Sequence, residues 1–89
     1  MTTPATVARW MLDELKREKI LYQEVVVDEI ATKFGEEFTY DNENGNLAID
    51  KRVLKEFRKL TEGTVVWERS ERLWRFRESA DEPNKRQVD

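Results

Sequence analysis

Apolar residues between Val7 and Leu15 recur at intervals of three and four positions, which is the spacing of one face of an α-helix. Thr3 and Pro4 precede this stripe. Thr is a favoured N-cap residue, and Pro fits the first helical turn because its missing N–H would have no partner there. We therefore expect a first helix after Thr3, with Trp10 at the edge of its apolar face.

A second helix is predicted from about Gln23 to Phe34. Its buried face is expected to hold Val26, Val27, Ile30, Ala31 and Phe34. Gly35 follows as a left-handed stop. The β-branched run 25–27 would also suit a strand, but the apolar pattern continues to Phe34 at helical spacing, which favours the helix.

A third helix is predicted from Lys51 to Thr61, with Asp50 as N-cap and Gly63 just beyond its end. Its inward-facing residues are expected to be Val53, Leu54, Phe57 and Leu60.

Residues 64–77 predict a β-hairpin with Ser70-Glu71 at the turn. This register places Val65 opposite Phe76 and Trp67 opposite Trp74, so that one face is wholly apolar. The other face carries Val66, Glu68, Leu73 and Arg75. We expect Trp67, Trp74, Phe57 and Met11 to be buried together.

Residues 36–49 leave two alternatives open. Asn44-Gly45 is a strong turn signal between two short apolar segments, which suits a hairpin. A structured loop pinned by Phe38 and Tyr40 fits equally well. A calcium loop does not fit, because Tyr40 and Lys51 would occupy the first and last ligand positions, where carboxylates are needed.

Composition narrows the function classes. The chain has 89 residues, which suits one domain, expected over residues 1–78 with a disordered tail over 79–89. It contains no His and no Cys, so the usual general base, thiolate chemistry and the common zinc ligands are missing. We expect no enzyme activity, no cofactor, no metal and no small-molecule substrate. The sequence shows neither an apolar run long enough to span a bilayer nor the pattern of a secretory leader. We therefore expect no membrane association and a cytoplasmic location.

Charge is distributed unevenly along the chain. The net charge is −3, yet acidic residues outnumber basic ones about two to one in residues 1–50, and that ratio is reversed in residues 51–77. Five basic residues of the third helix fall within an arc of about 120° opposite its apolar stripe. The hairpin extends this basic surface with Arg69, Arg72, Arg75 and Arg77. The candidate nucleic-acid-binding residues are Lys51, Arg52, Lys55, Arg58, Lys59, Arg69 and Arg72.

The chain resembles two groups of proteins. The order of three helices and a hairpin is similar to a winged helix from about Thr3 to Glu78, so the expected fold class is α+β, a three-helix winged-helix-like domain with a C-terminal β-hairpin. It departs from that pattern at residues 36–49, since a helix-turn-helix has a turn of roughly 3–4 residues. The chain also resembles a family of small uncharacterised bacterial proteins, through Val7-Ala8-Arg9-Trp10-Met11, Phe34-Gly35, Asn42-Glu43-Asn44-Gly45-Asn46, Val53-Leu54-Lys55-Glu56-Phe57-Arg58, Val65-Val66-Trp67-Glu68-Arg69 and Trp74-Arg75-Phe76-Arg77.

The winged-helix resemblance implies a third helix in the DNA major groove and a wing on the backbone. A non-enzymatic binding module for nucleic acid is therefore the first hypothesis. The alternative is a domain that binds another protein or forms a homodimer, with an apolar patch around Trp10, Val66 and Leu73 as its contact surface.

Overall fold

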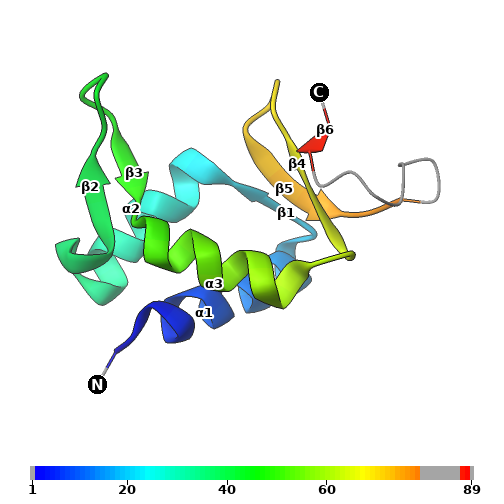
Figure 1. Ribbon diagram of the computed structural model, residues 1–89, viewed down its shortest axis with the longest axis horizontal. Helices are drawn as coiled ribbons and strands as arrows, with labels where there is room; N and C mark the ends of the chain where they lie inside the picture. The colour runs from blue at the N-terminus through cyan, green and yellow to red at the C-terminus, as the bar shows by residue number, and fades with distance from the viewer. Residues whose placement is uncertain (1, 79–86, 89) are drawn as a thin grey trace.

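Three helices, a small sheet and a separate hairpin make up the part of the chain that the computed structural model describes, residues 2–78 and 87–88 (Figure 1). In chain order the elements are α1 (Pro4–Glu18), β1 (Ile20–Tyr22), α2 (Gln23–Phe34), the 3-10 helix η1 (Glu36–Phe38), β2 (Thr39–Asp41), β3 (Leu47–Ile49), α3 (Lys51–Thr61), β4 (Val65–Glu68), β5 (Leu73–Phe76) and β6 (Gln87–Val88). The fold is α+β, and the three predicted helices and the C-terminal hairpin are confirmed.

The helix ends follow the predicted local chemistry. The Thr3 hydroxyl accepts a hydrogen bond from the Thr6 N–H at 3.2 Å and so caps α1. Lys19 caps the C-terminus of α1: it has a left-handed φ of 73° and donates its N–H to the Leu15 carbonyl. Gly35 follows α2 with a φ of 91°, a conformation that glycine adopts at little cost.

The main sheet has the order β1-β5-β4-β6, with β1 antiparallel to β5. Leu21 of β1 lies opposite Trp74, and both are buried. The sequence did not predict β1. This strand ties the segment between α1 and α2 to the C-terminal hairpin, so that the two ends of the fold share one sheet.

The register of the β4–β5 hairpin is the predicted one. Val65 lies opposite Phe76, and Trp67 lies opposite Trp74. The Trp74 ring meets the Phe57 ring of α3 edge-on, with centroids 5.3 Å apart, and the Trp67 ring at 4.8 Å. Met11, Phe57 and Trp74 belong to the core, and Trp67 packs against it partly buried. The predicted aromatic core is therefore confirmed.

Residues 36–49 form the hairpin, the first of the two alternatives. Strands β2 and β3 pair with Tyr40 opposite Ala48. The side-chain carbonyl of Asn42 accepts hydrogen bonds from the backbone N–H groups of Asn44 and Asn46, at 2.9 and 3.0 Å. Gly45 takes a φ of 78° in the turn. Phe38, at the base of the hairpin, is buried in the core and fixes the hairpin to the domain.

One predicted core residue is wrong. Leu60 was expected to point inward, but 37% of its surface is exposed. Thr61 is fully buried in its stead, one turn after Phe57, and its hydroxyl donates to the Phe57 carbonyl at 2.8 Å. This bond satisfies the buried hydroxyl and lets a polar residue complete the inner stripe of α3.

The predicted tail falls largely outside the described residues. Residues 79–86 and 89 are not described, so the expected disorder there stays a prediction. Gln87 and Val88 form β6, which runs parallel to β4 with Gln87 opposite Trp67. Strand β6 therefore extends the sheet at the edge of β4.

Replacing Trp74 by Ala is expected to lower the free energy of unfolding by about 3–5 kcal/mol, because it removes a buried ring that contacts both Phe57 and Trp67. Urea denaturation measures this change. Leu60→Ala is the matched control and should cost far less, since Leu60 is already partly exposed. Equal costs for the two variants would contradict the role given to Trp74.

Candidate nucleic-acid interface

Helix α3 has one buried side and one charged side. Val53, Phe57 and Thr61 are buried, one turn apart from one another. The five basic residues predicted for the binding surface, Lys51, Arg52, Lys55, Arg58 and Lys59, are all exposed. Since the core holds the apolar side against α1 and the sheet, the basic side of α3 faces solvent.

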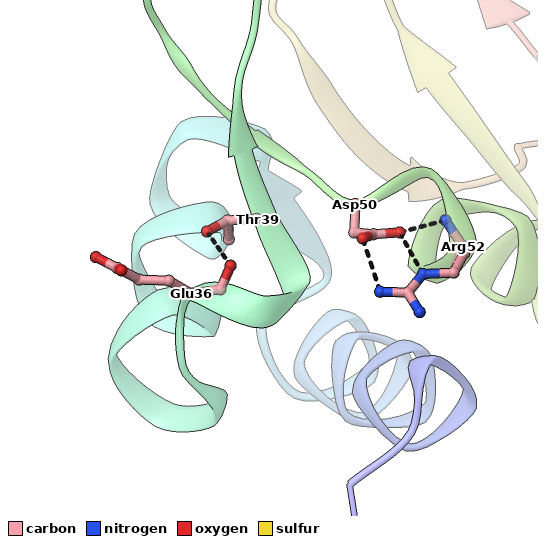
Figure 2. Close-up of polar contacts among 4 residues, drawn as sticks. All are labelled: Glu36, Thr39, Asp50 and Arg52. Atoms are coloured by element: carbon pink, nitrogen blue, oxygen red, sulfur yellow. Dashed lines mark hydrogen bonds and ion pairs between the residues drawn. The ribbon is translucent and has the colours of Figure 1, made fainter.

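Arg52 is held by the residue that caps the helix (Figure 2). Asp50 accepts hydrogen bonds from the Arg52 backbone N–H at 2.7 Å, from Nε at 3.1 Å and from Nη2 at 3.0 Å. The Arg52 side-chain hydrogen bond is the main cause that lowers the pKa of the Asp50 carboxyl, and the backbone bond adds to it. Arg52 therefore forms an ion pair within its own helix turn, while 61% of its side chain stays exposed.

Lys59 is also paired. Its Nζ lies 3.3 Å from Oε2 of Glu56, one turn back on α3. Lys51, Lys55 and Arg58 make no ion pair with any other described residue. The predicted five-residue patch therefore divides into three cations without an ion-pair partner among the described residues and two that already pair with an acid.

The two predicted wing arginines lie at the tip of the β4–β5 hairpin, apart from α3 (Figure 1). Arg69 and Arg72 are exposed. Arg72 has a left-handed φ of 55°, and its carbonyl accepts a hydrogen bond from the Gln23 N–H at 3.0 Å, which anchors the hairpin to the start of α2. Arg75 is partly buried and pairs with Glu68 at 2.6 Å, so it does not extend this surface.

The second hairpin adds acidic groups beside the basic helix. In Figure 1, the β2–β3 and β4–β5 hairpins rise on the same side of the molecule, at opposite ends of α3. Asp41 and Glu43 are exposed on β2 and in its turn. The hairpin that precedes α3 in the chain therefore carries exposed negative charge, in contrast to the exposed positive charge of α3 itself.

The prediction of an exposed apolar patch around Trp10, Val66 and Leu73 is wrong. Val66 and Leu73 are 0% and 4% exposed, so they are already buried within the chain. Trp10 packs edge-on against Phe34 of α2, with ring centroids 5.5 Å apart. The exposed apolar side chains lie elsewhere: Ile20, Tyr22, Val25, Tyr40, Leu47 and Leu60.

Over residues 2–78 and 87–88, no group of three or more acidic, His or Cys side chains is placed to hold a metal ion. Within the same part of the chain, no helix combines the length and the apolar character needed to cross a membrane.

These features define a small α+β domain with an exposed basic helix between two hairpins. The chain belongs to DUF6953, a family of unknown function, whose model matches residues 3–76. The predicted resemblance to a small uncharacterised family is thereby confirmed. No curated protein and no solved structure matches the chain.

Replacing Asp50 by Ala is expected to destabilise the protein by about 1 kcal/mol, since it removes the N-cap of α3. The pKa of Asp50 is lowered in the folded state, so its ionised form stabilises the fold at neutral pH. That contribution is lost as the pH falls through the lowered pKa of Asp50, which lies beneath the ordinary range of an Asp carboxyl. Thermal melts of wild type and variant should therefore differ at pH 7 and converge in acid, whereas the exposed Glu43→Ala control should match wild type at pH 7.

Proposed function

We propose that this protein is a non-enzymatic, nucleic-acid-binding module that contacts the phosphate backbone through α3 and the tip of the β4–β5 hairpin. The observation that carries the proposal is the one-signed face of α3, where Lys51, Lys55 and Arg58 are exposed without an ion-pair partner among the described residues. Clustered cations of this kind attract polyanions and release their condensed counterions.

The order of elements supports the same proposal. Helix α1, strand β1, helices α2 and α3, and the β4–β5 hairpin follow one another as in a winged helix, with β1 paired to the second strand of the hairpin. In that class the helix before the hairpin enters the major groove. We assign α3 to this role and the β4–β5 hairpin to the wing.

The insertion between α2 and α3 restricts how the duplex can lie. The β2–β3 hairpin, whose second strand leads directly into α3, carries exposed Asp41 and Glu43, which would repel phosphates approaching from that side. We therefore propose that the backbone runs along the C-terminal half of α3 toward the wing, so that Lys55, Arg58 and the wing arginines make the main contacts. Arg52 and Lys59 contribute less, because each must leave an acidic partner.

We also propose that the protein is cytoplasmic. A protein without cysteine has no disulfide to lose in a reducing compartment, and nucleic acid is abundant in the cytoplasm, so we place the protein there. No cofactor or metal is needed for binding of this type.

Binding to a mixed-sequence DNA duplex, measured by fluorescence anisotropy at several salt concentrations, tests the proposal. The logarithm of the affinity should fall linearly with the logarithm of the salt concentration, by about 0.9 per phosphate contacted. The double variant Lys55→Glu/Arg58→Glu should bind at least about tenfold more weakly, which is about 1.4 kcal/mol. Arg52→Ala should lose less.

The matched control is Arg9→Glu/Lys16→Glu on α1, which makes the same change in net charge at two exposed basic residues outside α3 and the wing. It should keep most of the wild-type affinity. An equal loss in both double variants would mean that net charge alone governs binding. Absence of salt-dependent binding to duplex DNA, single-stranded DNA and RNA at micromolar protein would overturn the proposal.

A further inference from the structure

Strand β1 presents an open sheet edge flanked by exposed apolar side chains. Among the described strands, β1 has one neighbour, β5. The Gln23 N–H bonds to the Arg72 carbonyl. In an antiparallel ladder every second residue directs its backbone N–H and C=O toward the partner strand, so the backbone groups of Leu21 also point toward β5. The N–H groups of Ile20 and Tyr22 therefore point away from the sheet, toward a place where another strand would lie.

The surface beside this edge is apolar and hollowed. Ile20, Tyr22 and Val25 have 42%, 45% and 53% of their surface exposed. They line a cavity of about 320 Å³ between the end of α1 and the start of α2, together with Leu21. Large exposed aliphatic and aromatic groups gathered at one sheet edge are typical of a binding surface.

The rim of the cavity carries negative charge. Glu14, Glu18 and Glu29 line it, and Arg17 is the one basic residue among its lining groups. Arg17 already bonds to Glu14, and its Nη1 donates to Glu18 at 2.9 Å. The hydrogen bond with Glu14 is the largest cause that raises the pKa of Arg17, and the charges of Glu18 and Glu29 add to it. Three carboxylates thus surround one guanidinium.

A second cavity continues this acidic surface along α1 and α2. Its volume is about 460 Å³, and it shares Glu14 and Glu29 with the first. Trp10 and Asp28 also line it, with Lys33 as its one basic lining residue. A chain lying along β1 would therefore meet apolar side chains at the strand and carboxylates at both sides.

From this combination we propose that the β1 edge binds an extended segment of another protein in which apolar residues alternate with Lys or Arg. Backbone hydrogen bonds to Ile20 and Tyr22 would add the segment as a strand. Its apolar side chains would cover Ile20, Tyr22 and Val25, and its basic side chains would reach the carboxylates. A second copy of this chain fits less well, because two β1 edges placed together would bring Glu14, Glu18 and Glu29 of both copies close to one another.

This surface is separate from the proposed nucleic-acid interface. None of the lining residues of the two cavities lies on α3 or the β4–β5 hairpin. In Figure 1, α2 and β1 lie behind α3. The two activities can therefore be tested independently, and the failure of one leaves the other standing.

A fluorescein-labelled synthetic peptide of alternating Lys and Val, capped at both ends, is a suitable test ligand. Anisotropy gives its affinity for the full chain, and amide NMR spectra show where it binds. We expect shifts centred on the Ile20 and Tyr22 amides and an affinity that falls with salt. A peptide of the same charge with its central Val replaced by Pro should bind at least about tenfold more weakly, because Pro cannot donate a backbone hydrogen bond.

Two variants separate the apolar and charged contributions. Ile20→Thr/Val25→Thr removes apolar surface without changing charge, and Glu18→Gln/Glu29→Gln removes charge alone. Each should weaken binding at least about tenfold. Tyr40→Thr/Leu47→Thr is the matched control, since it makes the same kind of change at comparably exposed residues of the β2–β3 hairpin and should bind like wild type.

Three results would overturn the proposal. The first is equal affinity of the wild-type chain for the Val and Pro peptides, because charge alone would then explain the binding. This comparison does not depend on the folding of any protein variant. The second is the absence of amide shifts at Ile20 and Tyr22. The third is concentration-dependent self-association of the chain without peptide that Ile20→Thr/Val25→Thr abolishes, since the occupant would then be a second copy.

Discussion

The edge-on contact between the rings of Phe57 and Trp74 joins α3 to the sheet, and the rest of the molecule is arranged around it. Phe57 lies at the middle of the buried stripe of α3, between Val53 and Thr61. Trp74 lies on β5, the strand that pairs with both β1 and β4. This contact holds the apolar side of α3 against the sheet, and the charged side of the helix therefore faces solvent.

Acidic residues at the start of α3 and within it explain why the helix has fewer unpaired cations than its formal charge suggests. Arg52 begins the helix beside the residue that caps it, and Lys59 lies one turn after Glu56. Exposed pairs of this kind contribute little to stability, but they occupy two of the five cations on α3. The cations of α3 without an ion-pair partner among the described residues are a narrower group, Lys51, Lys55 and Arg58.

Local chemistry predicted much of this fold, and long-range pairing decided the rest. The cap at Thr3, the stop at Gly35 and the alternation of Val65 and Trp67 are properties of neighbouring residues, so the sequence alone predicted them. Strand β1 has only three residues, and its strand conformation depends on β5, some fifty positions later, so no local pattern predicts it.

The errors at individual residues have similar causes. Periodicity placed Leu60 on the inner face of α3, but the fully buried neighbour is Thr61, whose hydroxyl bonds to the turn before it. The candidate site was predicted as a set of charges on a helical wheel. Which of those charges are already paired depends on side-chain conformation, which a helical wheel does not give. The patch expected for self-association is absent for another reason: Val66 and Leu73, on the second face of the hairpin, are buried within the chain.

The pairing of β1 with β5 has a consequence for the order in which the chain acquires its structure. Helices α1, α2 and α3 all precede β5 in the sequence, yet the strand between the first two has no described sheet partner until residues 73–76 exist. A contact between residues so distant closes a long loop, whose entropy must be lost before the pairing is gained. During synthesis the helices are therefore made first, and the domain completes its core only when the C-terminal hairpin has left the ribosome.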